Sequence, residues 1–253
     1  MSESDRGFKL STREFFLLWQ AVHGEEREVP LGTPHFGRTR AARQRMVEET
    51  SQELYRRGLG TITRPDPDLR ALVSGLAEFE KALEIVFFKG TDMARGLATA
   101  GWSGTFAARV GDDVHLRSFR ATALASATVA SLPALQAGNG RAVNVRWDDY
   151  VRAGEAGERE GVPGFMEVLR YAGIREPEAY TLMRAVTNRI GGGQLGLTAR
   201  NRDGNARPTG RTVSWLDTRE GRYLVRQADG WLVLAPTDQA RLTGAVDELL
   251  STN

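Results

Sequence analysis

The sequence predicts an α+β protein with a central, mostly antiparallel mixed sheet, helical bundles packed around it, and two quasi-symmetric halves. In each half, the hydrophobic pattern changes once from helical to strand spacing. The order helix, four strands, helix therefore occurs twice. Phe106 corresponds to Tyr223 and Val114 to Trp231, both at an offset of 117 residues. Residue identity between the halves is poor, so the repeat rests on the order of the elements.

Three helices are predicted at the start of the first half, each from a start signal. Ser11, followed by Glu14, has the spacing of a capping box, and Gly24 ends this first helix. Thr39 is expected to cap a second helix that ends near Gly58. The prolines around Asp66 start the third helix. Residues 29–36, rich in Pro and Gly, are expected to be extended or loop-like.

Strands follow in the first half, and a helix closes it. The strand-sized runs are Leu83–Phe88, Met93–Ala100, Thr105–Val110 and Val114–Phe119. Asp112-Asp113 after a glycine indicates a tight hairpin turn between the last two runs. A helix over about residues 121–132 is expected to stop at Pro133.

The second half repeats this pattern after a connector. Val143, Val145 and Trp147 predict a strand, Asp148 is expected to cap a short helix, and the polar, glycine-rich residues 155–164 are expected to form a mobile loop. Pro177 opens the next helix, and Thr237 is expected to cap the last one. The strands predicted between these two helices are Gln194–Arg200, Arg211–Asp217, Arg222–Gln227 and Trp231–Leu234.

Length and composition describe an ordinary globular protein. The chain has 253 residues, 41% hydrophobic and 26% charged, with a formal net charge of +2. We expect one domain over residues 1–253, with sub-halves of about 1–140 and 141–253. The absence of cysteine excludes disulfides and thiolate chemistry. Met1–Lys9 is polar, unlike a signal peptide, and no apolar run approaches 20 residues, so we expect a cytoplasmic protein without membrane insertion.

Motifs for catalysis are weak in this sequence. Gly191, Gly193 and Gly196 form G-x-G-x-x-G with Asp217 further on, but a dinucleotide site needs a strand before the glycines and a helix after them. Here a predicted helix precedes them and a strand follows, which favours a flexible helix-to-strand turn. The three histidines lie in separate elements without metal-ligand spacing. We therefore expect no cofactor, no metal and no enzyme activity.

Arginines are dense in the C-terminal half and leave one alternative function open. Eight lie between residues 189 and 226 against three acidic residues, namely Arg189, Arg200, Arg202, Arg207, Arg211, Arg219, Arg222 and Arg226. Such a patch could bind the phosphates of a nucleic acid. Strand alternation would divide the arginines between two faces, however, and stacking aromatic residues are not interleaved with them. A solvated sheet edge with its loops explains them more simply.

A short W-x-G motif, Trp102-Ser103-Gly104, also occurs. In small helical-hairpin secretion substrates, this motif lies at the turn between two helices. Here it lies between predicted strands, so it does not make this chain such a substrate.

Five segments spread over nearly the whole chain form a more specific combination. They are Leu10-Ser11-x-x-Glu14-Phe15-x-x-Leu18-Trp19; Pro30-Leu31 with Gly37-x-Thr39 and Glu53-Leu54-x-x-Arg57-Gly58-Leu59; Asp66-Pro67-Asp68-Leu69; Gly191-Gly192-Gly193-Gln194-Leu195-Gly196; and Ser214-Trp215-x-Asp217-Thr218-x-x-Gly221-Arg222-Tyr223-Leu224, continuing to Gly230-Trp231 and Ala235-Pro236-x-Asp238. In this order they resemble the EspG family, the secretion-associated chaperones of the ESX (type VII) systems of actinobacteria.

The resemblance implies a binding function without chemistry. EspG-like proteins bind PE–PPE heterodimers in the cytosol and hold the exposed hydrophobic tip of the PPE helical bundle, which would otherwise aggregate. It also implies that the partner meets the sheet and adjacent loops, so we expect contacts at the Phe88–Ala100 hairpin and the C-terminal helices. Phe88, Met93 and Arg95 are the candidate contact residues. That Phe88 and Met93 are core residues instead is an equally open interpretation.

Overall fold

The computed structural model describes residues 7–37, 39–201 and 204–251. The polar N-terminal residues 1–6 and Arg202 of the arginine group lie outside this part. The chain forms two compact units. Unit 1 comprises Met1–Val86, Met93–Thr128 and Gly196–Gly210, and unit 2 comprises Phe87–Asp92, Val129–Leu195 and Arg211–Asn253. The division of the chain into sub-halves of about residues 1–140 and 141–253 stays a prediction.

The strands follow the order β1-β5-β4-β3-β2-β7-β8-β9-β10-β6 in a ten-stranded sheet. The first five are β1 (Phe8–Ser11), β2 (Lys81–Lys89), β3 (Asp92–Ala100), β4 (Gly104–Val110) and β5 (Asp113–Phe119), and the others are β6 (Val143–Arg146), β7 (Arg189–Arg200), β8 (Ala206–Thr218), β9 (Gly221–Ala228) and β10 (Trp231–Thr237). Pairs β1–β5, β3–β4 and β4–β5 are antiparallel, as are β8–β9, β9–β10 and β10–β6. An isolated parallel bridge joins Ala137 to Arg222. The predicted fold class is confirmed.

The two sets of five strands have the same internal order. Each set places its first strand at an end of the sheet, beside its last strand. In both sets, a helix follows the first strand. The first backbone N–H of that helix donates to the hairpin turn that precedes the last strand of the set. Thr12 N donates to Asp112 O at 2.8 Å, and Trp147 N donates to Gly230 O at 2.8 Å. The quasi-repeat is therefore seen in equivalent backbone hydrogen bonds, although the residues that form them differ in type.

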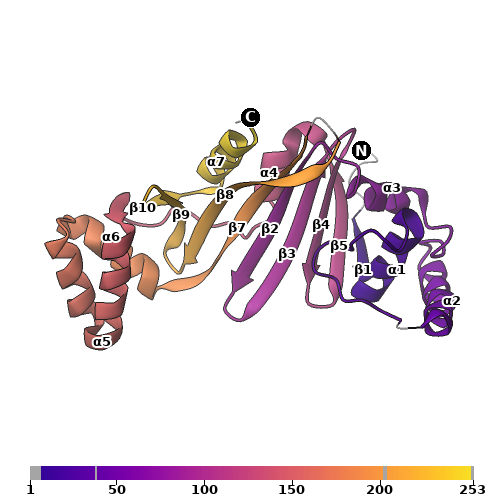
Figure 1. Cartoon of the computed structure of the whole chain (residues 1–253), viewed down its shortest axis with the longest axis horizontal. Helices are drawn as coiled ribbons and strands as arrows, with labels where there is room; N and C mark the ends of the chain where they lie inside the picture. Colours follow the sequence, from indigo (N-terminus) through magenta and orange to yellow (C-terminus); the bar gives the residue numbers. More distant parts are fainter. Residues whose placement is uncertain (1–6, 38, 202–203, 252–253) are drawn as a thin grey trace. The chain divides into compact units, whose positions relative to one another are not determined.

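Three helices accompany the strands of unit 1: α1 (Thr12–His23), α2 (Arg40–Arg56) and α3 (Pro67–Gly75). Figure 1 shows α1 and α3 beside the strands β1, β4 and β5, and α2 further from them. The capping box at Ser11 is formed as predicted, since Glu14 N donates to Ser11 Oγ at 3.2 Å and Ser11 N to Glu14 Oε2 at 2.6 Å. Thr39 and Asp66 cap the next two helices with their side-chain oxygens. The predicted strands of this half are confirmed within one or two residues.

The closing helix of the first half is shorter than predicted. A 3-10 turn over Ala121–Ala123 leads into α4 (Leu124–Val129), which ends before Pro133. Apolar side chains of α1, α3, β1 and β5 form the core of unit 1. Phe15, Leu18, Leu69 and Val114 in this core are fully buried.

Unit 2 contains α5 (Trp147–Tyr171), α6 (Glu176–Thr187) and α7 (Gln239–Ser251). The prediction of a mobile loop over residues 155–164 is wrong, because these residues lie within the helix α5. The chain departs from helical geometry at Gly161, whose φ of 70° is readily accessible to glycine. Figure 1 shows α5 and α6 side by side.

Three further local predictions are corrected in unit 2. Asp148 does not cap a short helix, because it lies in the first turn of α5, which begins at Trp147. The glycines 191–196 lie inside β7 and not in a helix-to-strand turn, since α6 ends at Thr187 and β7 begins two residues later. Asp238, rather than Thr237, caps α7. Its Oδ1 accepts from Arg241 N at 2.9 Å, while Thr237 belongs to β10.

A buried ion pair joins β8 to β9 in unit 2. Arg222 donates through Nε to Asp217 Oδ1 at 2.6 Å and through Nη2 to Asp217 Oδ2 at 3.1 Å. Nη2 also donates to Pro133 O at 3.0 Å. The neighbouring Tyr223 is buried and donates its hydroxyl to Asn139 O. Burial, as the main cause, raises the pKa of Tyr223. The segment Ser214–Leu224, the strongest of the family segments, thus contains a buried polar centre.

Candidate partner-binding surface

Met93 and Arg95 lie near the start of β3 in unit 1. Met93 is 58% exposed, so the alternative that it is a core residue is wrong. Arg95 is exposed as well, and its side chain lies against Gly32, whose added Cβ would be 3.3 Å from Arg95 Nε. Arg95 has no ion-pair or hydrogen-bond partner among the described residues. Both side chains are therefore available to another molecule.

Phe88 lies near the end of β2, in the part that belongs to unit 2, and is half-buried. One side of its ring lies over Gly192, where an added Cβ would come within 3.2 Å of the ring. The guanidinium of Arg189 lies over the ring, 4.5 Å from its centroid. Phe88 thus has structural contacts and retains partial exposure, so both interpretations of this residue stay open.

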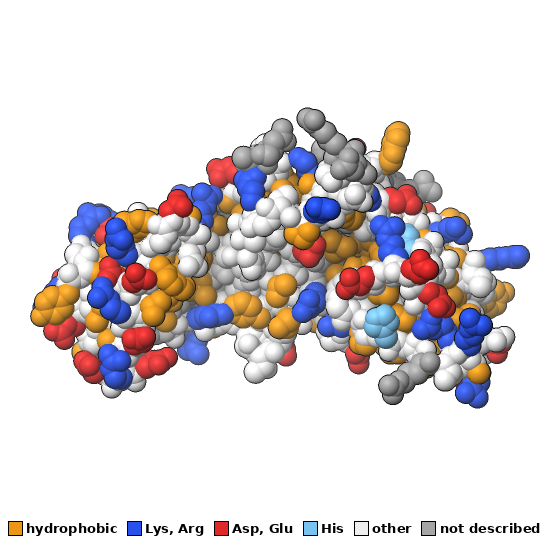
Figure 2. All heavy atoms as spheres, in the orientation of Figure 1, with side chains coloured by type: hydrophobic (Ala, Val, Ile, Leu, Met, Phe, Trp, Pro, Cys, Tyr) orange, Lys and Arg blue, Asp and Glu red, His pale blue; other side chains and the backbone are white. Residues whose placement is uncertain are grey.

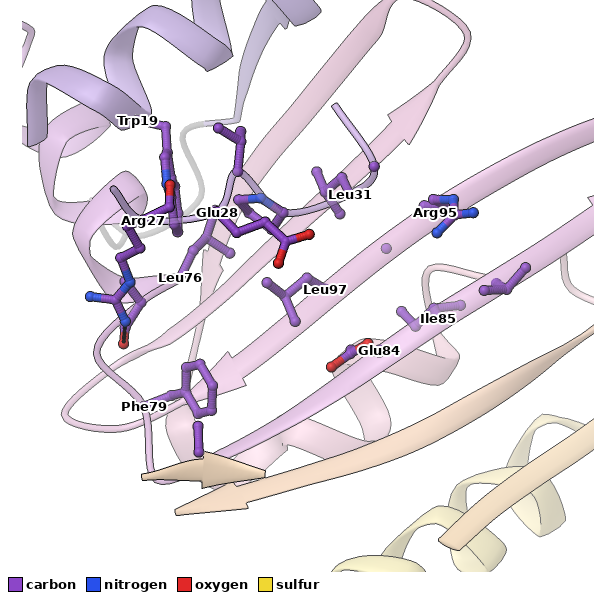
Figure 3. Close-up of a pocket in the computed structure, with 17 residues that line it drawn as sticks. Trp19, Arg27, Glu28, Leu31, Leu76, Phe79, Glu84, Ile85, Arg95 and Leu97 are labelled. Atoms are coloured by element: carbon purple, nitrogen blue, oxygen red, sulfur yellow. Dashed lines mark hydrogen bonds between the residues drawn. The ribbon is translucent and has the colours of Figure 1, made fainter. Parts of the chain in front are cut away.

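A groove of about 530 Å³ lies beside Arg95 in unit 1. Its walls come from α1, the segment after α1, the end of α3, and strands β2 and β3 (Figure 3). Its apolar lining includes Trp19, Val29, Leu31, Leu76, Phe79, Ile85, Val86 and Leu97. Arg27, Glu28, Glu84 and Arg95 supply its charges. An apolar groove with a few charged groups is a typical binding feature.

The segment after α1 is held firmly along this groove. Trp19 Nε1 donates to Arg27 O at 3.3 Å, and Arg27 Nη2 donates to Ala77 O at 3.0 Å. Further along, Arg109 Nη1 donates to Gly32 O at 2.7 Å. Leu31 has a φ of 66°, an uncommon conformation for a branched side chain that persists only where neighbouring contacts enforce it. No local sequence pattern predicts this groove, because its residues are far apart in the chain.

The helical pair α5–α6 of unit 2 exposes apolar side chains of its own. Tyr171 is 79% exposed and Tyr180 47% exposed. A hollow between the two parts of α5 is lined by Arg152, Glu155, Arg159, Val168 and Tyr171, with two neighbouring residues. In Figure 2, acidic and basic side chains are interspersed over these helices. The mixture of charges differs from the uniformly basic surface of a nucleic-acid site.

The arginines between residues 189 and 226 do not form one solvent-facing patch. Arg222 is buried with Asp217. Arg200 donates to the backbone oxygens of Ala77 and Phe79. Arg226 pairs with Glu248 at 3.0 Å. These contacts remove the main feature that suggested phosphate binding.

The structure brings together few groups for catalysis in its described part. No cluster of three or more His, Cys, Asp or Glu side chains there could hold a metal ion. His23 packs against Trp19 at 4.3 Å between ring centroids, and desolvation is the main cause that lowers its pKa. An added Cβ at Gly191 would lie 2.6 Å from Phe88 O, so this glycine admits a neighbouring strand. No described helix is both long and apolar enough to cross a membrane.

Comparison with known proteins places the chain in a family. The model of the EspG family matches residues 11–248. No match is found among curated proteins. A solved structure of the type VII secretion system chaperone EspG5 of Mycobacterium tuberculosis, in complex with a PE25–PPE41 dimer, superposes with a TM-score of 0.72 and 16% identity, covering 98% of this chain and 96% of that chain.

A second solved structure, the peroxisomal multifunctional enzyme type 2 of Drosophila melanogaster, has a TM-score of only 0.17 at 11% identity, with 92% of this chain and 48% of that chain covered. That value does not indicate a common fold. The EspG5 match shows that the fold is shared, and the family model extends over nearly the whole chain. The chain therefore belongs to the EspG family.

Proposed function

We propose that this protein is a cytoplasmic chaperone of a type VII (ESX) secretion system that binds the PPE member of PE–PPE heterodimers and keeps it soluble before export. The observation that carries the proposal is the family match over residues 11–248. The fold shared with EspG5, a chaperone solved in complex with PE25–PPE41, supports it. A chaperone of this kind acts by binding, so we propose no enzymatic reaction and no cofactor.

The physical task of such a chaperone is to cover an apolar surface reversibly. An exposed apolar patch on a secretion substrate promotes aggregation, and a complementary apolar surface removes it from water. Met93 and the apolar walls of the neighbouring groove offer such a surface in unit 1. Methionine suits this use because its flexible, polarisable side chain adapts to different shapes.

We propose Phe88, Met93 and Arg95 as partner contacts with different roles. Met93 would pack on the apolar tip. The guanidinium N–H groups of Arg95 have no acceptors among the described residues, and they would donate to a carboxylate or backbone oxygen of the partner. Phe88, held between Gly192 and Arg189, would present its remaining exposed edge.

Co-expression with a PE–PPE pair encoded nearby tests the proposal. We expect a ternary complex that elutes as a single species in gel filtration. Met93→Asp and Arg95→Glu should each weaken this complex at least about tenfold, the scale of one lost contact residue at an interface. Failure with every neighbouring PE–PPE or PPE-like pair would reject the function itself.

Matched substitutions on α2 control for general effects on folding. Tyr55 is 74% exposed, and Arg56 lies next to it on the same solvent-facing helix turn. Tyr55→Asp and Arg56→Glu repeat the chemical changes away from the groove, and we expect them to leave the complex intact. Equal loss of binding in both pairs of variants would reject the assigned contact residues while leaving the chaperone function standing.

A further inference from the structure

Trp102 is the most exposed large hydrophobic side chain of the described residues, with a relative exposure of 106%. It lies at the tip of the turn between β3 and β4 in unit 1. Tryptophan is strongly enriched among the residues that dominate binding interfaces. No ring or cation contact to its indole exists within the described chain. The contacts of the fold leave this side chain without a structural role.

The turn that carries Trp102 is fixed on both sides. Gly101 N donates to Ser103 O at 3.1 Å, and the added Cβ of a larger residue at Gly101 would come within 2.8 Å of Glu78 O. At Gly104, an added Cβ would come within 2.4 Å of the Phe119 ring. The backbone on either side of the indole is thus packed closely. A rigid support presents the aromatic ring at little entropic cost on binding.

A depression of about 650 Å³ adjoins the indole. It is lined by Glu78, Phe79, Glu80, Gly101, Trp102 and Arg200. Phe79 also lines the groove beside Arg95, so the two hollows share one residue. Figure 3 shows Phe79 at the edge of that groove.

The charged groups of this depression differ in how they are engaged. Arg200 donates to Phe79 O at 2.7 Å and to Ala77 O at 3.0 Å, and its guanidinium lies 5.5 Å from the Phe79 ring centroid. Glu78 and Glu80 are exposed and form no side-chain ion pair or hydrogen bond with the described residues. Glu78 acts on His23 through its charge alone, so both carboxylates and one aromatic face remain available beside each other.

We propose that Trp102, Glu78 and Glu80 form a second binding site, which takes an arginine or lysine side chain from a basic segment of a protein partner. A guanidinium or ammonium group can lie over the indole face while it pairs with the carboxylates. Charge complementarity favours this occupant over a nucleic acid or an anionic lipid surface, which the two glutamates would repel. The site goes beyond the proposed chaperone function, because none of its three residues lines the groove beside Arg95.

The chain provides its own comparison for this chemistry. Trp231 in unit 2 is 39% exposed and already has the Arg146 guanidinium 5.2 Å from its ring centroid. The indole N–H signals of ¹⁵N-labelled protein can therefore report a free and an occupied tryptophan in one spectrum. Trp102→Phe assigns the signal, and the other indole signals show whether each variant is folded.

The probe is an acetylated, amidated Gly-Arg-Gly-Arg peptide, with Gly-Glu-Gly-Glu as its counterpart. We expect the arginine peptide to shift the Trp102 signal saturably, with little effect on Trp231 and no saturable effect of the glutamate peptide. The Glu78→Gln/Glu80→Gln double variant should weaken binding at least about fivefold, and added salt should weaken binding to the wild type.

Equal shifts by both peptides, or unchanged affinity in the double variant, would overturn the assignment. A change of the Trp102 signal with phosphatidylcholine vesicles, in the absence of arginine binding, would show a lipid-facing residue instead. Trp102→Ala should also retain the ternary complex with PE–PPE, which separates this site from the chaperone surface. Loss of that complex would place Trp102 within the chaperone surface and refute a second site.

Discussion

Replacing Asp217 by Asn should destabilise the fold by about 3–5 kcal/mol, because the Arg222 guanidinium would stay buried without its counter-charge. Both side chains are nearly inaccessible, with relative exposures of 4% for Asp217 and 1% for Arg222. The bidentate contact of 2.6 and 3.1 Å satisfies both carboxylate oxygens. Arg222→Met should cost a similar amount by leaving the carboxylate uncompensated.

The double variant Asp217→Asn/Arg222→Met separates the charge effect from the loss of packing. Removing both charges leaves mainly the lost hydrogen bond from Arg222 to Pro133 O, worth about 1 kcal/mol. The double variant should therefore be more stable than either single variant. Urea unfolding followed by circular dichroism measures these differences in the free energy of unfolding.

The exposed pair Arg226–Glu248, at 3.0 Å, is the matched control. Its side chains are 53% and 73% exposed, so Arg226→Met should change stability by less than about 1 kcal/mol. If the double variant Asp217→Asn/Arg222→Met lost as much stability as the two single variants together, the coupling between Asp217 and Arg222 would be refuted. A loss below about 1 kcal/mol in Asp217→Asn would refute the uncompensated-charge argument.

Three further predictions concern other parts of the fold. Gly138→Ala should lower stability by about 1–3 kcal/mol in urea unfolding, since the new Cβ would lie 2.1 Å from the Tyr223 ring; an unchanged midpoint would contradict this close contact. Ser11→Ala should lose about 1 kcal/mol by removing the acceptor of the Glu14 amide, and a loss equal to that of an exposed mid-helix substitution would argue against the cap. The pKa of His23 is lowered in the folded state. The contribution of His23 to the free energy of unfolding is therefore fully present above the unfolded pKa of 6.5, and it is lost as the pH falls below that value. Thermal melts of wild type and His23→Gln between pH 7.5 and 5 should show a smaller pH dependence in the variant, and parallel curves would contradict it.

Local sequence signals determined much of the secondary structure. The capping box at Ser11 and Glu14 depends on residues three apart, so it could be recognised without tertiary information. Strand-sized runs likewise located β4 and β5, and β5 begins with the alternation of buried and exposed residues that a strand with one face on the core shows. The repeated order of elements gave the correct fold class. The family resemblance rested on segments along the whole chain and agrees with the match over residues 11–248.

Two glycine-rich segments were misinterpreted because the close packing that requires their glycines is not visible in the local pattern. Gly191 and Gly192 allow the close approach of Phe88 O and Trp215 O, which their own sequence does not reveal. In residues 155–164, Gly and charged residues suggested a loop. An added Cβ at Gly164 would come within 2.9 Å of Ala156 O, so this glycine permits close packing within α5. Packing overrode local propensity in both segments.

The sequence by itself therefore determined the fold class, the family and the expectation of a binding function. Tertiary structure decided which side chains are available for that function. Strand periodicity could not distinguish a core Met93 from the 58% exposed residue observed, nor foresee the fully exposed Trp102. Exposure depends on which distant segments cover a residue, and the groove joins Leu31 with Leu97 through contacts that no local pattern contains.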